Sequence, residues 1–440
     1  MLATWITGQI VLNGVVQGMV YGLFALSIVL IYRSTKVINF AVGNIGLFGS
    51  GLVVICNLNY GVPFWLSVLV GLVVGTLWGA IIELTVVRRL FRAPRVILLV
   101  ATIGVSQLSL AILTALPENE QPRHSYPMAI GKIWNIGDMR LKGPQLLVLV
   151  AVPLVALALT WFLNRTLLGR TVRAAAGNPD LARMHGINPK SLSTIVWSLG
   201  GLVGTISMVL LGGLNGSSAS LSSIGPTSLL RALVAALIAR FTSFRTALIA
   251  GVGIGLVEAV FKFNFIADPG LIDMLLLVVV LVAVGVLSRE RSPGDAVFAF
   301  TPKVEAVPER LKTIFWVRNL DRLTLLVPLV FGAMVPLFVD RPSRLLLYAS
   351  ILAFAICALS MTVLTGWAGQ LSLGQMAFAG IGALTAAAFT RGMEIDMSLG
   401  DTQLIYLKLS PLPFLVSVFL AGFVTADIAA IIGSGALRVR

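Results

Sequence analysis

The sequence is short of charge, cysteine and catalytic motifs, and each shortage narrows the class of protein. Charged residues make up 11% of the 440 residues against 58% hydrophobic residues, which excludes an ordinary soluble protein. Both cysteines, Cys56 and Cys357, lie in apolar runs and indicate neither a disulfide framework nor a metal site. We find no phosphate-binding glycine loop, metal-ligand cluster or nucleophile triad, so the sequence predicts neither a cofactor nor an enzyme.

What the sequence has instead is a series of long apolar runs. A helix of roughly 20 residues crosses the hydrocarbon core, and in lipid the backbone must satisfy its own hydrogen bonds. The short alternating segments of a β-barrel are not evident. We therefore predict an all-α, polytopic membrane protein with about 13 transmembrane or re-entrant segments. They are residues 10–32, 40–56, 63–84, 96–116, 145–163, 192–214, 227–239, 247–261, 271–287, 323–339, 344–365, 373–390 and 411–432.

The basic residues indicate which ends of these segments face the cytoplasm. The formal net charge is +14, and Lys and Arg lie beside the apolar runs, which fits the positive-inside bias and not nucleic-acid binding. The clearest cluster contains Arg88, Arg89, Arg92 and Arg95. All such clusters fall on one side when the N-terminus is placed outside, so we expect residues 169–190 in the cytoplasm.

Residues 169–190 form a long polar and basic interruption between two apolar runs. Asn178 can cap a helix, Pro179 suits its first position, and Asp180 complements the positive end of the helix dipole. Gly186 ends the same short helix, which we expect at the membrane surface. Two interpretations remain open. The stretch is either a cytoplasmic surface loop, which spacing alone favours, or a docking site for a soluble partner.

A change of composition divides the chain into two membrane modules. Residues 289–322 are rich in charge, contain three prolines and hold no spanning run, so we expect a cytoplasmic basic linker. Residues 1–288 would then be the first module and residues 323–440 the second.

The two modules share a short repeat. Residues 39–49 align with residues 370–380, with amides at the first and sixth positions and glycines at the fifth and eleventh. The matched pairs are Asn39 with Gln370, Gly43 with Gly374, Asn44 with Gln375, and Gly49 with Gly380. Both copies are expected to run outward, so the modules are related in parallel, with a path between them. Glycines favour close helix packing and amides in lipid usually face a wet cavity, so packing and path-lining roles stay equally open.

Glu258 lies inside an apolar run, where an acid is rare and often functional. It could equally pair with a nearby basic residue, and Lys262 follows one helical turn later. A stand-alone secondary transporter or channel, for a small solute such as urea or an amide, could use such an acid for ion coupling. That function is the alternative to the one below.

Three stretches resemble the permease subunits of branched-chain amino acid ABC importers. Residues 32–41 resemble the signature of the first permease type, and residues 364–375 resemble that of the second. Residues 169–188 resemble the cytoplasmic loop that docks on the ATP-binding subunit in such importers. The resemblance covers nearly the whole chain.

The resemblance implies a mechanism, a location and partners. In such importers a periplasmic or extracellular solute-binding protein delivers the solute, two permease halves form the path, and two ATP-binding subunits drive it. The chain would then be a multi-pass protein of the bacterial inner membrane. The residues implied in coupling are Ala175, Asn178, Pro179, Asp180 and Gly186. The candidate path residues are Asn39, Gly43, Asn44, Gly49, Gln370, Gly374, Gln375 and Gly380.

The sequence departs from the family pattern in three respects, at Val42, at Gln375 and in the extent of the second module. Val42 and Gln375 stand where the two permease types usually have histidine, so the expected solutes are branched-chain amino acids or related small polar solutes. The second module resembles only the opening part of its type. We therefore expect a fusion of a complete first module with a truncated second one, and a further permease segment as an additional partner.

Overall fold

The computed structural model describes most of the two membrane modules. The described residues are 7–35, 38–90, 93, 95–116, 126–128, 130–137, 139–177, 179–216, 221–265, 270–287, 314, 318–319, 326, 330, 332–334, 341–366, 374–399 and 402–437. The chain divides into two compact units, Met1–Arg289 and Glu290–Arg440. Nearly all of the expected linker, and most of the expected span over residues 323–339, lie outside the described residues.

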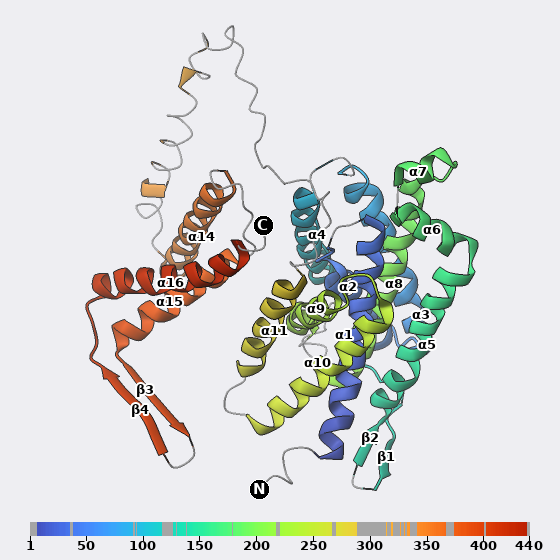
Figure 1. Ribbon diagram of the computed structural model, residues 1–440, viewed down its shortest axis with the longest axis horizontal. Helices are drawn as coiled ribbons and strands as arrows, with labels where there is room; N and C mark the ends of the chain where they lie inside the picture. The colour runs from blue at the N-terminus through green and yellow to red at the C-terminus, as the bar shows by residue number, and fades with distance from the viewer. Residues whose placement is uncertain are drawn as a thin grey trace. The chain divides into compact units, whose positions relative to one another are not determined.

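Unit 1 is a bundle of helices with one small hairpin (Figure 1). Its helices are α1 (Gly8–Thr35), α2 (Val42–Leu58), α3 (Phe64–Ile82) continued by the π-helical turn η2 (Glu83–Val87), α4 (Arg95–Ala115), α5 (Gly143–Arg165), α6 (Leu167–Gly177), α7 (Pro179–Met184), α8 (Pro189–Asn215), α9 (Leu221–Ile238), α10 (Phe244–Asn264) and α11 (Leu271–Leu287). Strands β1 (Ile133–Ile136) and β2 (Met139–Lys142) pair antiparallel, with Ile133 opposite Lys142. The hairpin and the start of α1 lie at one end of the unit, and α6 and α7 lie at the other (Figure 1).

Helix α1 is the centre of unit 1 and is buried along most of its length. It packs most extensively on α10, where glycines on the two helices, such as Gly18 and Gly255, face each other. Small residues let two helix backbones approach closely, which is how helices pack in membranes. The outer helices expose large apolar side chains instead. On α5, for example, Leu157 is 71% exposed and Trp161 63%, as expected of a lipid-facing surface.

These helices confirm the predicted all-α, polytopic membrane fold. Eight described helices are long and apolar enough to cross a membrane, and three shorter apolar helices accompany them. The count of about 13 segments stays a prediction. Two boundaries differ from expectation. Helix α9 starts at Leu221, before the expected span over residues 227–239, and an additional helix, α6, precedes the expected short helix.

The segment before the β1–β2 hairpin is anchored in the bundle by Tyr126. This side chain is 2% exposed, its hydroxyl lies 2.8 Å from Ser50 Oγ in α2, and its amide donates to the Gly216 carbonyl oxygen at 3.1 Å. Burial raises the pKa of the Tyr126 phenol above its ordinary value, while the hydrogen bond with Ser50 acts in the opposite direction. The phenol therefore stays protonated and neutral.

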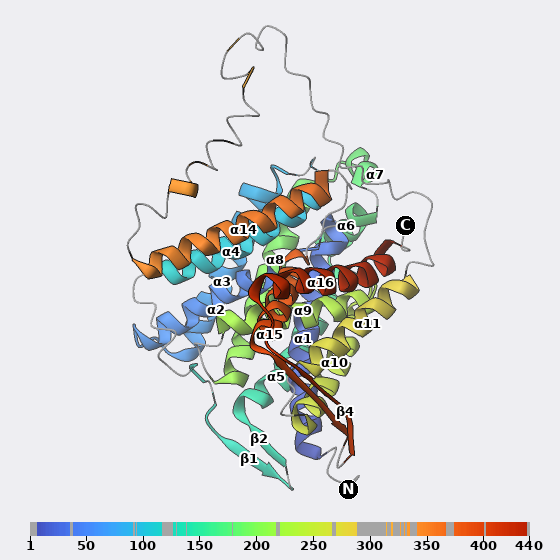
Figure 2. The ribbon, with the colours of Figure 1, turned by 90° about the vertical axis from the view of Figure 1, so that its left-hand side faces the viewer.

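Unit 2 contains three described long helices, α14 (Pro342–Gly366), α15 (Gln375–Arg391) and α16 (Phe414–Leu437). Between α15 and α16, strands β3 (Met393–Leu399) and β4 (Thr402–Leu409) form an antiparallel hairpin that extends beyond the helices (Figure 2). We did not expect this hairpin. The alternation of apolar and polar residues in Met393–Leu399 was the signal for it, because a strand turns successive side chains to opposite faces.

Candidate functional site

The expected short helix is present as α7 (Pro179–Met184), and Gly186 ends it in the predicted way. The Ile187 amide donates to the Ala182 carbonyl oxygen at 3.0 Å, and the Gly186 amide donates to the Arg183 carbonyl oxygen at 3.0 Å. This pair of hydrogen bonds is a Schellman motif, in which the residue after the helix adopts a left-handed conformation. Gly186 has φ +77°, which glycine adopts without the steric strain of a Cβ atom.

The start of the next helix, α8, is held by two sets of hydrogen bonds. The Asn188 side chain accepts a hydrogen bond from the Lys190 amide at 3.1 Å and so caps α8. Arg88, at the end of η2, donates to the Lys190 carbonyl oxygen at 3.3 Å and to Thr194 Oγ1 at 2.8 Å. The start of α8, which follows α7 in the chain, is therefore tied to the end of α3.

The α7 helix presents apolar side chains to its surroundings. Met184 is 84% exposed and Leu181 52%. Exposed basic residues, including Arg173 and Lys190, lie before and after it in the chain. An apolar patch rimmed by charge is typical of a surface that binds a protein partner.

The structure places the predicted coupling residues in this segment. Ala175 lies in α6, half-buried against the core, while Pro179 and Asp180 begin α7 and Gly186 follows it. Asn178 lies outside the described residues. Their role in coupling stays a prediction.

The first copy of the repeat forms the entry to α2. Asn39 is 1% exposed, and its Oδ1 accepts a hydrogen bond from the Ala41 amide at 2.8 Å, which shapes the turn before the helix. Asn44 is 5% exposed and donates from Nδ2 to Ser106 Oγ at 2.8 Å and to the Ser106 carbonyl oxygen at 3.1 Å. Asn44 thus bridges α2 and α4 inside the bundle.

The two glycines of this copy lie against other helices. A Cβ atom on Gly49 would stand 2.6 Å from the Thr205 side chain and 2.8 Å from the Gly71 carbonyl oxygen. A Cβ atom on Gly43 would meet the Gly225 carbonyl oxygen of α9 at 3.4 Å. This geometry supports a packing role for Gly49, and the path-lining role of both glycines stays a prediction.

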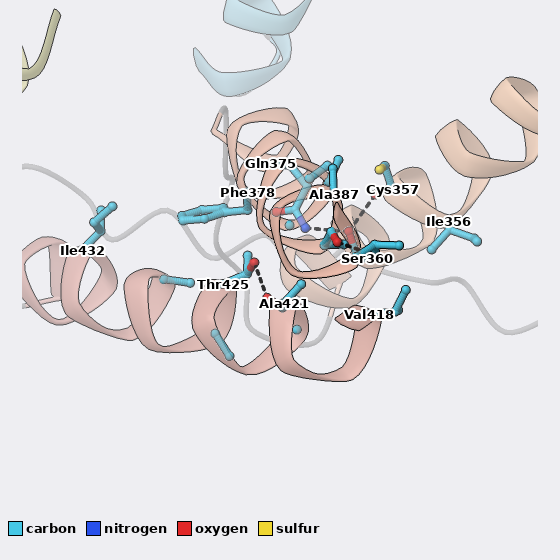
Figure 3. A pocket seen from close by; sticks show the side chains of 18 of the residues that line it. Ile356, Cys357, Ser360, Gln375, Phe378, Ala387, Val418, Ala421, Thr425 and Ile432 are labelled. Carbon is cyan, nitrogen blue, oxygen red and sulfur yellow. Dashed lines mark hydrogen bonds between the residues drawn. The ribbon is translucent and has the colours of Figure 1, made fainter. Parts of the chain in front are cut away.

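The second copy has a different environment. Gln375 begins α15 and donates from Nε2 to Ser360 Oγ of α14 at 2.6 Å (Figure 3). It lines an apolar cavity of about 1340 Å³ formed by α14, α15 and α16. No described heavy atom lies within 4 Å of a Cβ atom placed on Gly374 or Gly380, and Gln370 lies outside the described residues.

Glu258 and Arg231 form the buried centre of a charge cluster. Glu258 Oε2 lies 2.8 Å from Arg231 Nε of α9, and Glu258 Oε1 lies 2.6 Å from Lys262 Nζ. Arg231 Nη2 also lies 3.4 Å from Asp273 Oδ1 of α11, and its Cζ stands 5.9 Å from the centre of the Tyr21 ring of α1. Pairing with Lys262, one of the two roles left open for Glu258, is present, and Arg231 is an additional partner.

Sequence reasoning missed two of the residues that organise these sites. Glu83 is 1% exposed and accepts a hydrogen bond from Thr194 Oγ1 at 2.6 Å, and Arg231 is 7% exposed. Both stand inside expected apolar spans, so the criterion that identified Glu258 applied to them as well. No group of three or more His, Cys, Asp or Glu side chains suited to a metal ion occurs within the described part of the chain.

The sequence of this chain is similar to one described protein family, and its fold matches one solved structure weakly. A family described as "Branched-chain amino acid transport system / permease component" matches residues 10–285, which is more than half of the chain and nearly all of unit 1. Among solved structures, PsaBC from Streptococcus pneumoniae in complex with Fab is similar at 14% identity over 64% of this chain and 95% of that chain. The TM-score of this match is 0.37.

Three individual relatives each match a part of the chain. The high-affinity branched-chain amino acid transport system permease protein LivH of Escherichia coli (strain K12) is 27% identical over 64% of this chain and 95% of its own length. The protein BraD of Pseudomonas aeruginosa, described in the same words, has the same identity and coverage. The fructose import permease protein FrcC of Rhizobium meliloti is 31% identical over 38% of this chain and 46% of its own length.

Proposed function

The chain belongs to the family of permease components of branched-chain amino acid transport systems, and from this premise we propose that it forms the translocation path of an ABC importer. Members of this family are transport components and not enzymes, and the chain is a multi-pass protein of the bacterial inner membrane. We propose that separate ATP-binding subunits energise it and that a solute-binding protein supplies the solute.

The observation that carries this proposal is the family match combined with the α6–α7 segment. A transporter that worked alone does not need a short, exposed helix at one end of its bundle. Such a helix suits a partner that pushes on the bundle from outside the lipid. Ala175, Asn178, Pro179, Asp180 and Gly186 are proposed as the coupling residues of this segment.

The proposed solutes are branched-chain amino acids or related small polar solutes. LivH and BraD carry the first class in their names, whereas FrcC is named for fructose, so the fold itself does not restrict the solute. We propose that the buried amides Asn39 and Asn44 and their counterparts in unit 2, together with the repeat glycines, line the path. Glu258 is paired with two cations, so it is not an uncommitted acid for ion coupling.

The test is the substitution Asp180→Asn in proteoliposomes that contain the chain and its ATP-binding and solute-binding partners. We expect unchanged membrane insertion, continued ATP hydrolysis and a large loss of ATP-driven solute uptake, because the coupling helix loses its N-terminal charge. Asp427→Asn, at an exposed position of α16, is the matched control. Undiminished uptake in vesicles without any ATP-binding subunit would contradict the proposal.

A further inference from the structure

Helix α9 lies between the repeated residues of α2 and the charge cluster. On one side, Gly225 and Leu229 face Gly43, with a Cβ atom on Gly43 at 3.4 Å from the Gly225 carbonyl oxygen and 3.7 Å from Leu229 Cβ. A Cβ atom on Gly225 would lie 3.7 Å from Asn44 Oδ1. Two residues after Leu229, Arg231 points away from this side, because successive helix positions are about 100° apart. Contacts that restrain the Arg231 side chain on one side of α9 therefore also restrain the packing of its other side against Asn44.

The charges that fix Arg231 come from two other helices. Its pair with Glu258 of α10 is the stronger one, since the two side chains are 9% and 2% exposed. The pair with Asp273 of α11 is longer, at 3.4 Å, and the Asp273 side chain is 61% exposed. Solvent weakens an exposed pair much more than a buried one, so Glu258 is the partner that determines the position of Arg231.

A buried ion pair is a poor way to stabilise a membrane bundle. Desolvation of the two charges largely offsets their attraction, and apolar side chains of similar size often stabilise a fold as well or better. Ionisable residues inside membrane helices are for this reason usually functional. The ion pair between Arg231 and Glu258 forms at only one relative position of α9 and α10. An apolar contact is less directional and would allow several positions.

The far end of α9 is held by a tight turn, in which the Phe241 amide donates to the Ala236 carbonyl oxygen at 2.9 Å. Arg240 and Phe241, which follow the helix, both have φ +53°, a left-handed conformation that costs a residue with a side chain free energy. Phe241 is buried, and its ring centre lies 4.5 Å from that of Tyr32 at the end of α1. Helix α1 in turn contacts α6, so this end of α9 is held close to the proposed docking segment.

We infer that Arg231 is a positioning residue for translocation, whose ion pair with Glu258 holds α9 over Asn44 and closes unit 1 in this state. Loss of the pair frees α9 to move about the turn at Arg240 and Phe241, which exposes the α2 face. The link to translocation rests on the proposed function, whereas the restraint on α9 does not.

The experiment measures how accessible α9 is to a water-soluble thiol reagent. Ser228 of α9 is 2% exposed, so Ser228→Cys, in a chain with Cys56→Ser and Cys357→Ser, reports any departure of α9 from its packing. The full chain is reconstituted in lipid vesicles, and the labelling rate is compared among pair variants. We expect Glu258→Gln and the double variant Arg231→Met/Glu258→Met to raise the rate at least about tenfold, a factor that corresponds to about 1.4 kcal/mol.

Two controls separate this restraint from general loosening. Asp273→Asn removes the other acid beside Arg231 and should change the rate less than about twofold, because that acid is exposed. Ser27 of α1 is buried against α8, and its Oγ donates to the Gly200 carbonyl oxygen at 3.0 Å. A cysteine placed there by Ser27→Cys should stay protected from the thiol reagent in every variant of the ion pair.

The double variant is decisive, because it leaves no unpaired buried charge and should fold. Suppose that the double variant has the same unfolding temperature as the parent protein and still protects Ser228→Cys from the thiol reagent. In that case Arg231 does not position α9 and the inference is wrong. Equal increases in labelling at Ser27→Cys and Ser228→Cys would also overturn it. Labelling requires neither ATP nor a partner, so a failure of the importer proposal in the uptake assay would be recognised separately.

Discussion

Thr194 Oγ1 donates to Glu83 Oε2 across 2.6 Å, and this hydrogen bond joins the first turns of α8 to the π-helical end of α3. Arg88 completes the connection, because its Nη2 lies 2.8 Å from Thr194 Oγ1 and 3.5 Å from Glu83 Oε2. A force on α7 would reach α3 through these three side chains. Part of the coupling between the docking segment and the bundle is therefore expected to depend on a residue outside the segment.

Thr194→Val tests this connection. The substitution keeps the side-chain shape but leaves the buried Glu83 carboxylate without its shortest hydrogen bond, which typically destabilises a fold by about 1–3 kcal/mol. We expect a lower unfolding temperature in detergent and weaker coupling of ATP hydrolysis to uptake. Ser198→Ala is the control, because the Ser198 hydroxyl donates within α8, to the Thr194 carbonyl oxygen at 2.8 Å. Equal effects of the two substitutions would exclude a special role for Thr194.

The turn after α7 provides a second test. Gly186→Ala places a Cβ atom at φ +77°, which should destabilise the turn by about 1–2 kcal/mol and fray α7. Gly177→Ala, at the end of α6, should be neutral or slightly stabilising, because no described atom crowds that position and alanine favours helix. Hydrogen exchange over residues 179–187 should rise in the first variant alone. We also expect the first variant alone to lose ATP-driven uptake.

The sequence predicted the fold well because membrane helices follow simple rules. Each long described helix overlaps an expected apolar run, and the Gly186 stop was recognised from residue type alone. The β3–β4 hairpin was not predicted, because the predicted elements rest on long apolar runs. Its strands are short and alternating, and such a signal is weak for each strand.

The candidate site was predicted less completely, because tertiary contacts determine it. Asn44 and Gln375 occupy equivalent repeat positions, yet one bridges α2 and α4 while the other lines a cavity in unit 2. Sequence alone also could not show that Glu258 pairs with Arg231, because 27 residues separate the two along the chain. Local spacing identified only Lys262, one turn away.

The repeat glycines should respond differently to the same substitution. Gly49→Ala forces a methyl group against Thr205 and Gly71, and overpacking of this kind usually costs about 1–3 kcal/mol. Gly380→Ala, at the matching position of α15, meets no described atom within 4 Å and should gain up to about 1 kcal/mol from helix propensity. Thermal unfolding of the two variants in the same detergent is the measurement. A loss of stability in Gly380→Ala as large as that in Gly49→Ala would show that α15 is packed on this side.

The repeat amides allow packing to be distinguished from path lining. Asn44→Leu removes two hydrogen bonds to Ser106 in the interior and should lower stability by about 1–3 kcal/mol, whatever its effect on uptake. Gln375→Leu removes one hydrogen bond at the edge of an open apolar cavity, so its effect on stability should be small. If Gln375 lines the path, the same variant should still impair uptake several-fold, because the solute loses a polar contact. Ser360→Ala is the control, since it removes the same hydrogen bond but keeps the amide. Normal uptake by Gln375→Leu, measured at equal amounts of inserted protein, would remove this residue from the proposed path.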